Sequence, residues 1–257
     1  MARRPHDTRL PPPFLKRIWL PEAEDGAVDW PDWVDPDSYP FTIPFARDGL
    51  DIGFERAVTI IVGENGSGKS TLLEAIATMA GFNEGGGAQG MAAVGNGHAS
   101  GIDGGALGRT LKSAWLPQVG RGWFFRAETF FSVARYLDEA GSPHADFLSA
   151  SHGEGFLDFF EERLRQQGLF IFDEPEAALS PQKQFEFLKI LRRMQRDANC
   201  QVIMATHSPI LMALPEADLW AIDPFAIQPT TLEETAHYRL YREFVLYPHE
   251  TVEAMIE

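Results

Sequence analysis

The 257-residue sequence contains only one cysteine, Cys200. A single thiol excludes an internal disulfide and a cysteine-rich metal site, and it is typical of proteins from a reducing compartment. No stretch approaches the roughly 20 consecutive apolar residues that a membrane-spanning helix needs. Residues 1–6 also lack the apolar run of a secretory signal peptide. From these absences we expect a cytoplasmic protein without membrane insertion.

The sequence is also poor in basic residues. It has 22 Lys and Arg against 37 Asp and Glu, which gives a net charge of −15. A surface of this sign repels nucleic acid at long range, so nucleic-acid binding as the main activity is disfavoured. The exception is the first 17 residues. They form either a basic arm that contacts phosphates or an acidic partner protein, or else a solvated, frayed terminus. The basic residues there are Arg3, Arg4, Arg9, Lys16 and Arg17.

The histidines predict no metal centre. Five of them show no pairing with each other or with cysteine at metal-ligand spacing: His98, His144, His152, His237 and His249. Among these five, only His152 lies in a segment to which a function is assigned below.

Short apolar runs alternate with segments of helical periodicity. Strands are predicted at Ala57–Val62, Trp123–Phe125, Leu169–Phe172 and Gln201–Ala205. Helices are predicted at Thr71–Ala80, Thr129–Glu139, Glu154–Gln166 and Pro181–Arg196, the last with Phe185, Leu188 and Leu191 facing inward. This alternation predicts an α/β fold with a mainly parallel sheet covered by helices. We expect residues 1–257 to form a single domain of this kind.

Four other segments complete the predicted organisation. Residues 1–56 hold N-terminal strands and a Pro-rich segment. Residues 81–108 contain eleven glycines and are expected to be a mobile loop without regular structure, because glycine loses much backbone entropy on folding. Residues 123–166 form a small helical lobe, and Glu233–Tyr247 a C-terminal helix that docks on the rest of the protein.

Residues 63–70 read GENGSGKS and match the pattern G-x-x-x-x-G-K-[ST] between a predicted buried strand and a predicted helix. Glycines let this backbone curl so that successive N–H groups point at a phosphate, beside the positive end of the helix. Lys69 is expected to reach the β- and γ-phosphates, and Ser70 to hold Mg²⁺. The expected nucleotide-binding residues are Gly63, Glu64, Asn65, Gly66, Ser67, Gly68, Lys69, Ser70 and Thr71. The sequence therefore predicts ATP and Mg²⁺ as cofactors.

The run Leu169–Phe172 ends in two adjacent carboxylates, Asp173 and Glu174. At the carboxyl end of a buried parallel strand, Asp173 can hold the water shell of Mg²⁺ while Glu174 orients or deprotonates the attacking water. Alone such a strand end is a weak signal, but together with the phosphate loop it predicts ATP hydrolysis.

These segments resemble the ATP-binding-cassette (ABC) class of P-loop ATPases, in the soluble branch that includes structural-maintenance-of-chromosomes-type heads and small stand-alone bacterial AAA/ABC-like ATPases. Three further segments carry the resemblance. Ser151–Gly155 (SHGEG) stands 22 residues before Asp173, where the family has its serine–glycine signature. Glu174–Pro181 is similar to the stretch that leads into the dimer-contact loop. Ala205–Pro209 (ATHSP) follows a predicted strand, as the family's switch histidine does.

The resemblance implies several roles. In the family, the signature of one subunit closes on the γ-phosphate held by the other, so Ser151 and Gly153 are expected to bind ATP across a homodimer. His207 is expected to hydrogen-bond the γ-phosphate or the attacking water. The signature reads SHGEG rather than the transporters' LSGGQ, which argues against a transporter subunit. Only about 80 residues separate Ser70 from Ser151, which leaves no room for a long coiled-coil insertion.

Three roles stay open. The candidates for the family's metal-sensing glutamine are Gln118, Arg126 and Glu128. The candidates for stacking on adenine are Tyr39 and Phe41, which could equally pack under the Pro-rich segment. The candidates for reaching a phosphate when the dimer closes are Arg109 and Arg121.

The predicted function is Mg²⁺-dependent ATP hydrolysis by an ATP-sandwiched homodimer that switches a partner protein, in nucleic-acid processing or phage-related defence. Its catalytic residues are expected to be Lys69, Glu174 and His207, and its Mg²⁺ ligands Ser70 and Asp173. Two alternatives remain: the ATPase subunit of a membrane transporter, and a nucleotide-binding regulatory module with little turnover. The intact catalytic set argues against the second alternative.

Overall fold

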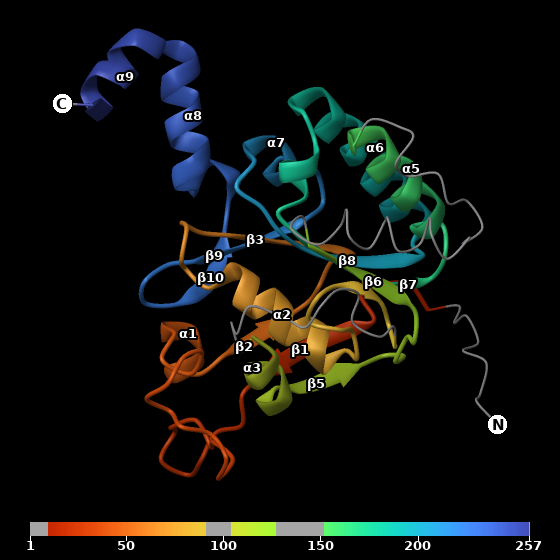
Figure 1. The fold of residues 1–257 in the computed structure, drawn as a ribbon, viewed down its shortest axis with the longest axis vertical. Helices are drawn as coiled ribbons and strands as arrows, with labels where there is room; N and C mark the ends of the chain where they lie inside the picture. Colours follow the sequence, from red (N-terminus) through yellow and green to blue (C-terminus); the bar gives the residue numbers. More distant parts are fainter. Residues whose placement is uncertain (1–9, 91–103, 127–151, 257) are drawn as a thin grey trace.

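The computed structural model describes residues 10–90, 104–126 and 152–256. Its centre is a seven-stranded sheet with the order β10-β9-β3-β8-β7-β6-β4 (Figure 1). The inner strands run parallel: β9 (Asp218–Ile222), β3 (Val58–Val62), β8 (Cys200–Ala205), β7 (Gly168–Asp173) and β6 (Gly122–Arg126). The edge strands β10 (Ile227–Thr230) and β4 (Gly87–Ala88) pair antiparallel. The predicted α/β fold is confirmed.

Both faces of this sheet are covered (Figure 1). One face packs on α2 (Lys69–Met79) and α3 (Gly104–Thr110). On the same side lie α1 (Pro44–Arg47) and a three-stranded antiparallel sheet of β2 (Asp51–Gly53), β1 (Leu15–Trp19) and β5 (Lys112–Trp115). The other face packs on α5 (His152–Arg163), α6 (Pro181–Asp197) and α7 (Pro209–Met212).

The inner strands are continuous apolar runs because side chains on both faces are buried. In β3, Ile61 belongs to the core on the α2 side, whereas Val58, Ile60 and Val62 belong to the core on the α6 side. In β7 the same alternation places Leu169 and Ile171 on the α2 side and Phe170 and Phe172 on the α6 side. The predicted strands at these positions are therefore confirmed.

A buried glutamine joins the two sheets. Gln201 in β8 is fully buried, and its Oε1 accepts hydrogen bonds from the backbone N–H groups of Phe14 and Leu15, each at 2.8 Å. Its Nε2 donates to the carbonyl of Leu15 at 3.0 Å. A buried amide with its polar atoms satisfied stabilises one relative placement of the two sheets.

The expectation that residues 81–108 lack regular structure is wrong at both described ends. Gly87 and Ala88 form β4, which pairs with β6. Gly104, Gly105 and Gly108 lie buried in α3, which packs closely on α2. A Cβ on Gly108 would stand 2.6 Å from the Ala75 carbonyl oxygen, so these glycines permit a close helix contact instead of loosening the chain. Residues 91–103 lie outside the described part.

Two other expectations need correction. In α6, Phe185 is 55% exposed, and the buried positions are Gln184, Phe187, Ile190, Leu191 and Met194. The described ends of segment 123–166 belong to the main body rather than to a separate lobe. Residues 123–126 are part of β6, and Phe156 of α5 packs edge-to-face against Phe125 of that strand with ring centroids 4.8 Å apart. The predicted helix at 129–139 lies outside the described residues.

The C-terminal segment consists of η2 (Leu232–Glu234), α8 (Ala236–Leu246) and α9 (Pro248–Ile256). No residue of α8 or α9 is buried, and the two helices project from the body (Figure 1). The prediction of a C-terminal helix that docks on the rest of the protein is therefore wrong beyond the first turn of α8, where His237 contacts His207. Within the described ranges no helix has the length and apolar character to cross a membrane.

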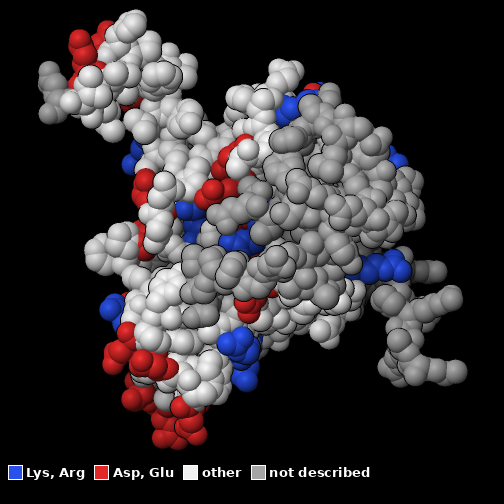
Figure 2. Space-filling view, viewed as in Figure 1, with Lys and Arg blue, Asp and Glu red and all other residues white. Residues whose placement is uncertain are grey.

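Negative charge gathers at one end of the molecule. Figure 2 shows acidic side chains clustered at the lower tip, where the Pro-rich segment lies in Figure 1. The exposed carboxylates of this segment are Glu22, Glu24, Asp25, Asp29, Asp32, Asp35 and Asp37. The net negative charge is thus partly concentrated in the segment that covers the α2 side.

Candidate functional site

Three polar segments meet at the carboxyl edge of the sheet. β8 lies between β3 and β7, and its last residue, Ala205, pairs with Ile61 on one side and Asp173 on the other. The segments that leave these strands are the loop 63–68, Glu174 and the pair Thr206–His207. Because parallel strands end at the same edge, residues more than 100 positions apart converge there.

The loop after β3 depends on its glycines. Gly68 has φ +96°, and a Cβ there would lie 2.9 Å from the ring of Phe45. A Cβ on Gly63 would lie 2.7 Å from the carbonyl oxygen of Ile222. α2 begins at Lys69 with no side chain capping its N-terminus. Its first N–H groups are therefore available to an anion held by the loop.

Lys69 folds back over this loop. Its side chain is buried, and Nζ donates to the carbonyls of Gly63 at 2.8 Å and Glu64 at 2.9 Å. Burial lowers the pKa of Lys69, while the nearby carboxylates of Glu174 and Asp173 act in the opposite direction. An ammonium has three donors, so one remains for a ligand beside the two carbonyl contacts.

Ser70 and Asp173 form a second pair at the start of α2. Ser70 Oγ donates to Asp173 Oδ1 at 3.1 Å, and Asp173 is 7% exposed. No group of three or more His, Cys, Asp or Glu able to hold a metal occurs among the residues with described positions. One hydroxyl and one carboxylate suit Mg²⁺, which keeps several water ligands and takes others from phosphate oxygens.

Glu174 and His207 face each other beside this pair. Glu174 lies at φ 50°, which is uncommon for a residue with a side chain and typical of functional sites. Its Oε1 is 3.3 Å from His207 Nε2. The backbone N–H of His207 donates to Glu176 Oε1 at 2.6 Å. Burial, followed by the charge of Lys69, lowers the pKa of His207, whereas Glu174 raises it. The net lowering of the pKa favours the neutral imidazole.

The other nitrogen of His207 contacts a residue that the sequence did not single out. His207 Nδ1 lies 2.8 Å from His237 Nε2, and the two rings are 4.9 Å apart between centroids. His237 stands in the first turn of α8, and no local spacing relates it to His207. Glu176 was also missed as a functional residue; burial is the main cause that raises its carboxyl pKa.

The buried polar atoms at this edge that have no hydrogen-bond partner within the described chain include Ser67 Oγ and His207 Nε2. Unsatisfied buried polar atoms are uncommon, and one explanation is a ligand that completes them. One belongs to the glycine loop and the other faces Glu174, so phosphate oxygens lying between these segments would satisfy both. The residues present thus fit a nucleoside triphosphate with Mg²⁺.

The remaining loop residues line a cavity of about 530 Å³ beside the glycine loop. Its lining includes Glu64, Asn65, Gly66 and Ser67 from the loop, together with Asp223, Thr235 and His237. Thr71, in the first turn of α2, is hydrogen-bonded to the hydroxyl of Tyr39. Phe41 is 4% exposed and packs edge-on against Trp30 at 5.0 Å, so it is a packing residue and not an adenine platform.

The candidates for the metal-sensing position separate clearly. Arg126 ends β6 opposite Asp173 in register, and its guanidinium pairs with Glu74 at 2.6 Å. Gln118 is exposed and precedes β6, which places it toward the opposite edge of the sheet and corrects that candidate. Glu128 lies outside the described residues.

The signature residues and the two arginines are placed as follows. Ser151 is outside the described residues, and Gly153 lies in the first turn of α5. Arg109 in α3 lies 4.0 Å from Glu84 and over the ring of Trp33. Arg121 directly precedes β6 at the amino edge, away from the glycine loop.

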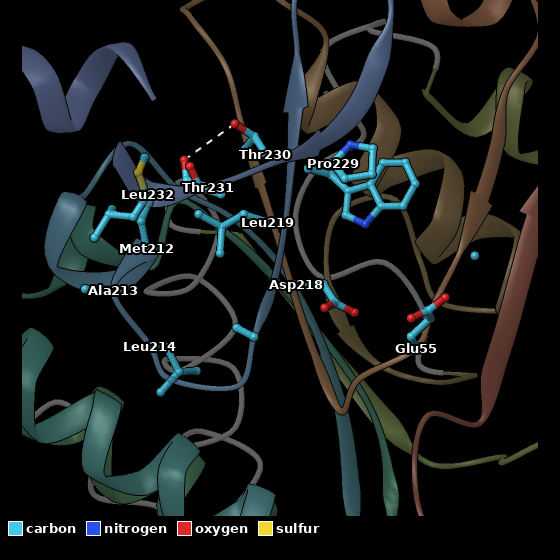
Figure 3. A pocket seen from close by; sticks show the side chains of 13 residues that line it. Glu55, Met212, Ala213, Leu214, Asp218, Leu219, Pro229, Thr230, Thr231 and Leu232 are labelled. Atoms are coloured by element: carbon cyan, nitrogen blue, oxygen red, sulfur yellow. Dashed lines mark hydrogen bonds between the residues drawn. The ribbon is translucent and has the colours of Figure 1, made fainter. Parts of the chain in front are cut away.

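A second cavity, of about 630 Å³, shares only Thr230 with the cavity beside the glycine loop (Figure 3). Glu55 and Asp218, which line it, come from the segment before β3 and the start of β9, so it opens toward the amino edge of the sheet. Its other walls include Met212, Leu214, Leu219 and Leu232 (Figure 3). This mostly apolar lining lacks the phosphate-binding features of the glycine loop.

Known proteins share parts of this sequence. Residues 124–213 match the family described as "AAA domain, putative AbiEii toxin, Type IV TA system", and residues 40–90 match a second AAA domain family. The hemin import ATP-binding protein HmuV of Burkholderia thailandensis is 31% identical over 193 residues, which are 61% of this chain and 70% of that protein.

Two other similarities cover less or are weaker. The OLD nuclease of Thermus scotoductus is 39% identical over 56 residues, 22% of this chain and only 11% of that protein. The structure of cbiO1 from Clostridium perfringens, part of the ABC transporter complex cbiONQ, superposes with a TM-score of 0.40 at 17% identity. That superposition covers 80% of this chain and 91% of cbiO1.

Proposed function

Because the chain belongs to the P-loop ATPases of the ABC/AAA type, which bind and hydrolyse ATP, we propose that hydrolysis takes place at the glycine loop and drives a homodimer that switches a partner protein. The observation that carries this proposal is the convergence of Ser70, Asp173, Glu174 and His207 at one sheet edge. Each residue type there has a separate task in phosphoryl transfer.

The loop residues bind the phosphates. The N–H groups of Gly63–Ser70 and the free donor of Lys69 neutralise the β- and γ-phosphates. Ser70 and Asp173 would hold Mg²⁺, which when bound screens the phosphate charge during transfer. The short Ser70–Asp173 distance of 3.1 Å suits two ligands of one cation.

Glu174 and His207 act on the water side. Glu174 is 41% exposed at its side chain, so a water can reach it, and it accepts the proton of the attacking water. His207 donates from Nε2 to the γ-phosphate or the water, and this nitrogen lies 3.3 Å from Glu174 Oε1.

Two substitutions test this assignment. We expect Lys69→Ala to lose ATP binding and turnover together, because it removes the phosphate cation. Glu174→Gln should keep ATP binding but lower phosphate release by a factor on the order of 100 or more. Glu55→Gln, at the amino edge of the sheet, is the matched control. Turnover of Glu174→Gln close to that of Glu55→Gln would refute the role of Glu174.

The homodimer is held together by ATP in this proposal. The signature residues Ser151 and Gly153 of one chain would contact the γ-phosphate on the other. The switched partner belongs to nucleic-acid processing or phage-related defence, in line with the toxin–antitoxin description of the family matched by residues 124–213. Capture of proteins by ATP-loaded Glu174→Gln, compared with Lys69→Ala, tests this part.

A second candidate is supported by the similarity to HmuV over 70% of that protein, which would make this chain the ATP-binding subunit of an importer. The SHGEG signature argues against it. Co-purification with a membrane protein that raises ATP turnover would favour the importer over the defence role.

A further inference from the structure

The site contains a contact that the proposed roles do not use. His207 Nδ1 and His237 Nε2 are 2.8 Å apart, within hydrogen-bond distance, and the ring planes are inclined by 58°. His237 is not adjacent to any segment of the glycine loop or the acidic strand end in sequence. The start of α8 brings it to the carboxyl edge of the sheet.

The start of α8 is held firmly. Thr235, 5% exposed, accepts from the N–H of Tyr238 at 3.3 Å and donates to the carbonyl of Leu232 at 2.7 Å. In the preceding turn, the N–H of Thr231 donates to Glu234 Oε2 at 3.2 Å. These caps fix the first turn of α8, although the rest of the helix is exposed.

The proton on the shared hydrogen bond can lie on either ring. If His207 donated from Nδ1, its Nε2 would carry a lone pair facing the carboxylate of Glu174 at 3.3 Å, which is repulsive. If His237 donates from Nε2, His207 carries its proton on Nε2 and faces Glu174 with an N–H. The second arrangement is the favoured one, since the hydrogen bond of one imidazole nitrogen sets the proton on the other.

We propose that His237 is a positioning residue for ATP hydrolysis. The Nε2–H of His237 donates to His207 Nδ1, so the proton of His207 stays on its own Nε2. This N–H of His207 is thereby aimed at the γ-phosphate side of the site. This inference rests on the proposed function of His207. It extends that function by assigning the C-terminal helix α8 to the catalytic centre. An outer residue of this kind orients a histidine that is itself in direct contact with the reacting group.

The experiment compares His237→Leu, which removes the donor and keeps bulk, with His237→Gln, whose side-chain amide restores an N–H. His249→Leu, an exposed histidine of α9, is the control. The readouts are the ¹⁵N shifts of the His207 imidazole, assigned by their loss in His207→Gln, and kcat and KM for ATP. We expect a single Nε2–H tautomer of His207 in the wild type and in His249→Leu.

In His237→Leu we expect mixed tautomers of His207 and a kcat lower by about ten-fold, with KM changed by less than about two-fold. His237→Gln should recover both the tautomer and most of kcat. An unchanged His207 tautomer in His237→Leu would overturn the inference, as would an equal loss of kcat in the Leu and Gln variants. If instead His207→Gln and Glu174→Gln hydrolyse ATP normally, the proposed function fails and with it the role of His237 in hydrolysis, while the tautomer measurement still shows whether His237 sets the His207 tautomer.

Discussion

Ser70 Oγ donates a hydrogen bond of 3.1 Å to Asp173 Oδ1 and thereby joins the start of α2 to the end of β7. The two residues are 103 positions apart in the sequence and belong to the two motifs from which ATP hydrolysis was predicted. Their contact depends on the order of the strands, since β8 separates β3 from β7.

Ser70→Ala removes the hydroxyl of this pair without changing the glycine loop. We expect the Mg²⁺ concentration for half-maximal ATP turnover to rise by a factor on the order of ten, because one of the two protein ligands is lost. Ser70→Thr keeps the hydroxyl and should stay within about two-fold of the wild type. Titration of turnover with Mg²⁺ at fixed ATP measures the effect, and identical curves for all three proteins would contradict the metal assignment.

The second prediction concerns the contact between α2 and α3. A Cβ on Gly108 would lie 2.6 Å from the carbonyl oxygen of Ala75 and 2.8 Å from Thr78 Cβ. We expect Gly108→Ala to lower the free energy of unfolding by about 1–3 kcal/mol, because the helices must separate to admit the methyl group. Denaturant unfolding measures this change.

Gly53→Ala provides the control for that measurement. Gly53 lies in β2, and a Cβ there would meet nothing within 4 Å. Its unfolding midpoint should lie close to that of the wild type. If Gly108→Ala and Gly53→Ala unfold together, α3 does not pack against α2 as described.

The contrast between β7 and α3 shows which features local sequence can predict. β7 was predicted because a short, uninterrupted apolar run is typical of a strand buried on both faces, and its burial pattern agrees. α3 was missed because glycine opposes helix formation by itself. The close approach to α2 that favours it is a tertiary property, invisible until both helices are placed.

The candidate site divides in the same way. The glycine loop and Asp173–Glu174 are contiguous motifs, so their chemistry can be recognised before the fold is known. His237 lies 30 residues after His207, and the path between them runs through α7, β9 and β10 before α8 returns to the site. Only the placement of those elements brings the two rings together.

The third prediction follows from the ion pair between Glu74 and Arg126. The two side chains are 2.6 Å apart and 3% and 15% exposed. Burial is the largest cause that raises the pKa of Glu74 from 4.5 to about 7, opposed by Arg126. A carboxyl whose pKa is higher in the folded state binds more protons there than in the unfolded chain between pH 4.5 and 7.

The contribution of Glu74 to the free energy of unfolding therefore falls as pH rises through that window, by a total on the order of 3 kcal/mol. Glu74→Gln cannot titrate, so its stability should lack this fall, although loss of the ion pair makes it less stable overall. Denaturant unfolding at several pH values, with Glu55→Gln as control, measures the two slopes. Parallel pH profiles for Glu74→Gln and Glu55→Gln would contradict the raised pKa.

The last prediction concerns the dimer. α5 leads directly into β7, so its N-terminus lies toward the carboxyl edge of the sheet, where the glycine loop also lies. α2 and α5, however, pack on opposite faces of that sheet. We expect the N–H groups at the start of α5 to meet a γ-phosphate held on another chain, because a helix N-terminus favours such an anion.

We therefore expect Glu174→Gln with ATP and Mg²⁺ to be dimeric at tens of micromolar protein. The ADP form should dimerise more weakly, because ATP binds the closed dimer more tightly than the separate chains and so favours the dimer. Adding Ser151→Arg should prevent this dimer while single-site ATP binding persists, since it places bulk and an unpaired cation in the interface. Adding Glu55→Arg to Glu174→Gln instead, at the opposite edge of the sheet, should leave the dimer intact. Light scattering on the three proteins decides the matter. If all remain monomeric with saturating ATP, or all dimerise equally, the signature segment does not contact ATP across an interface.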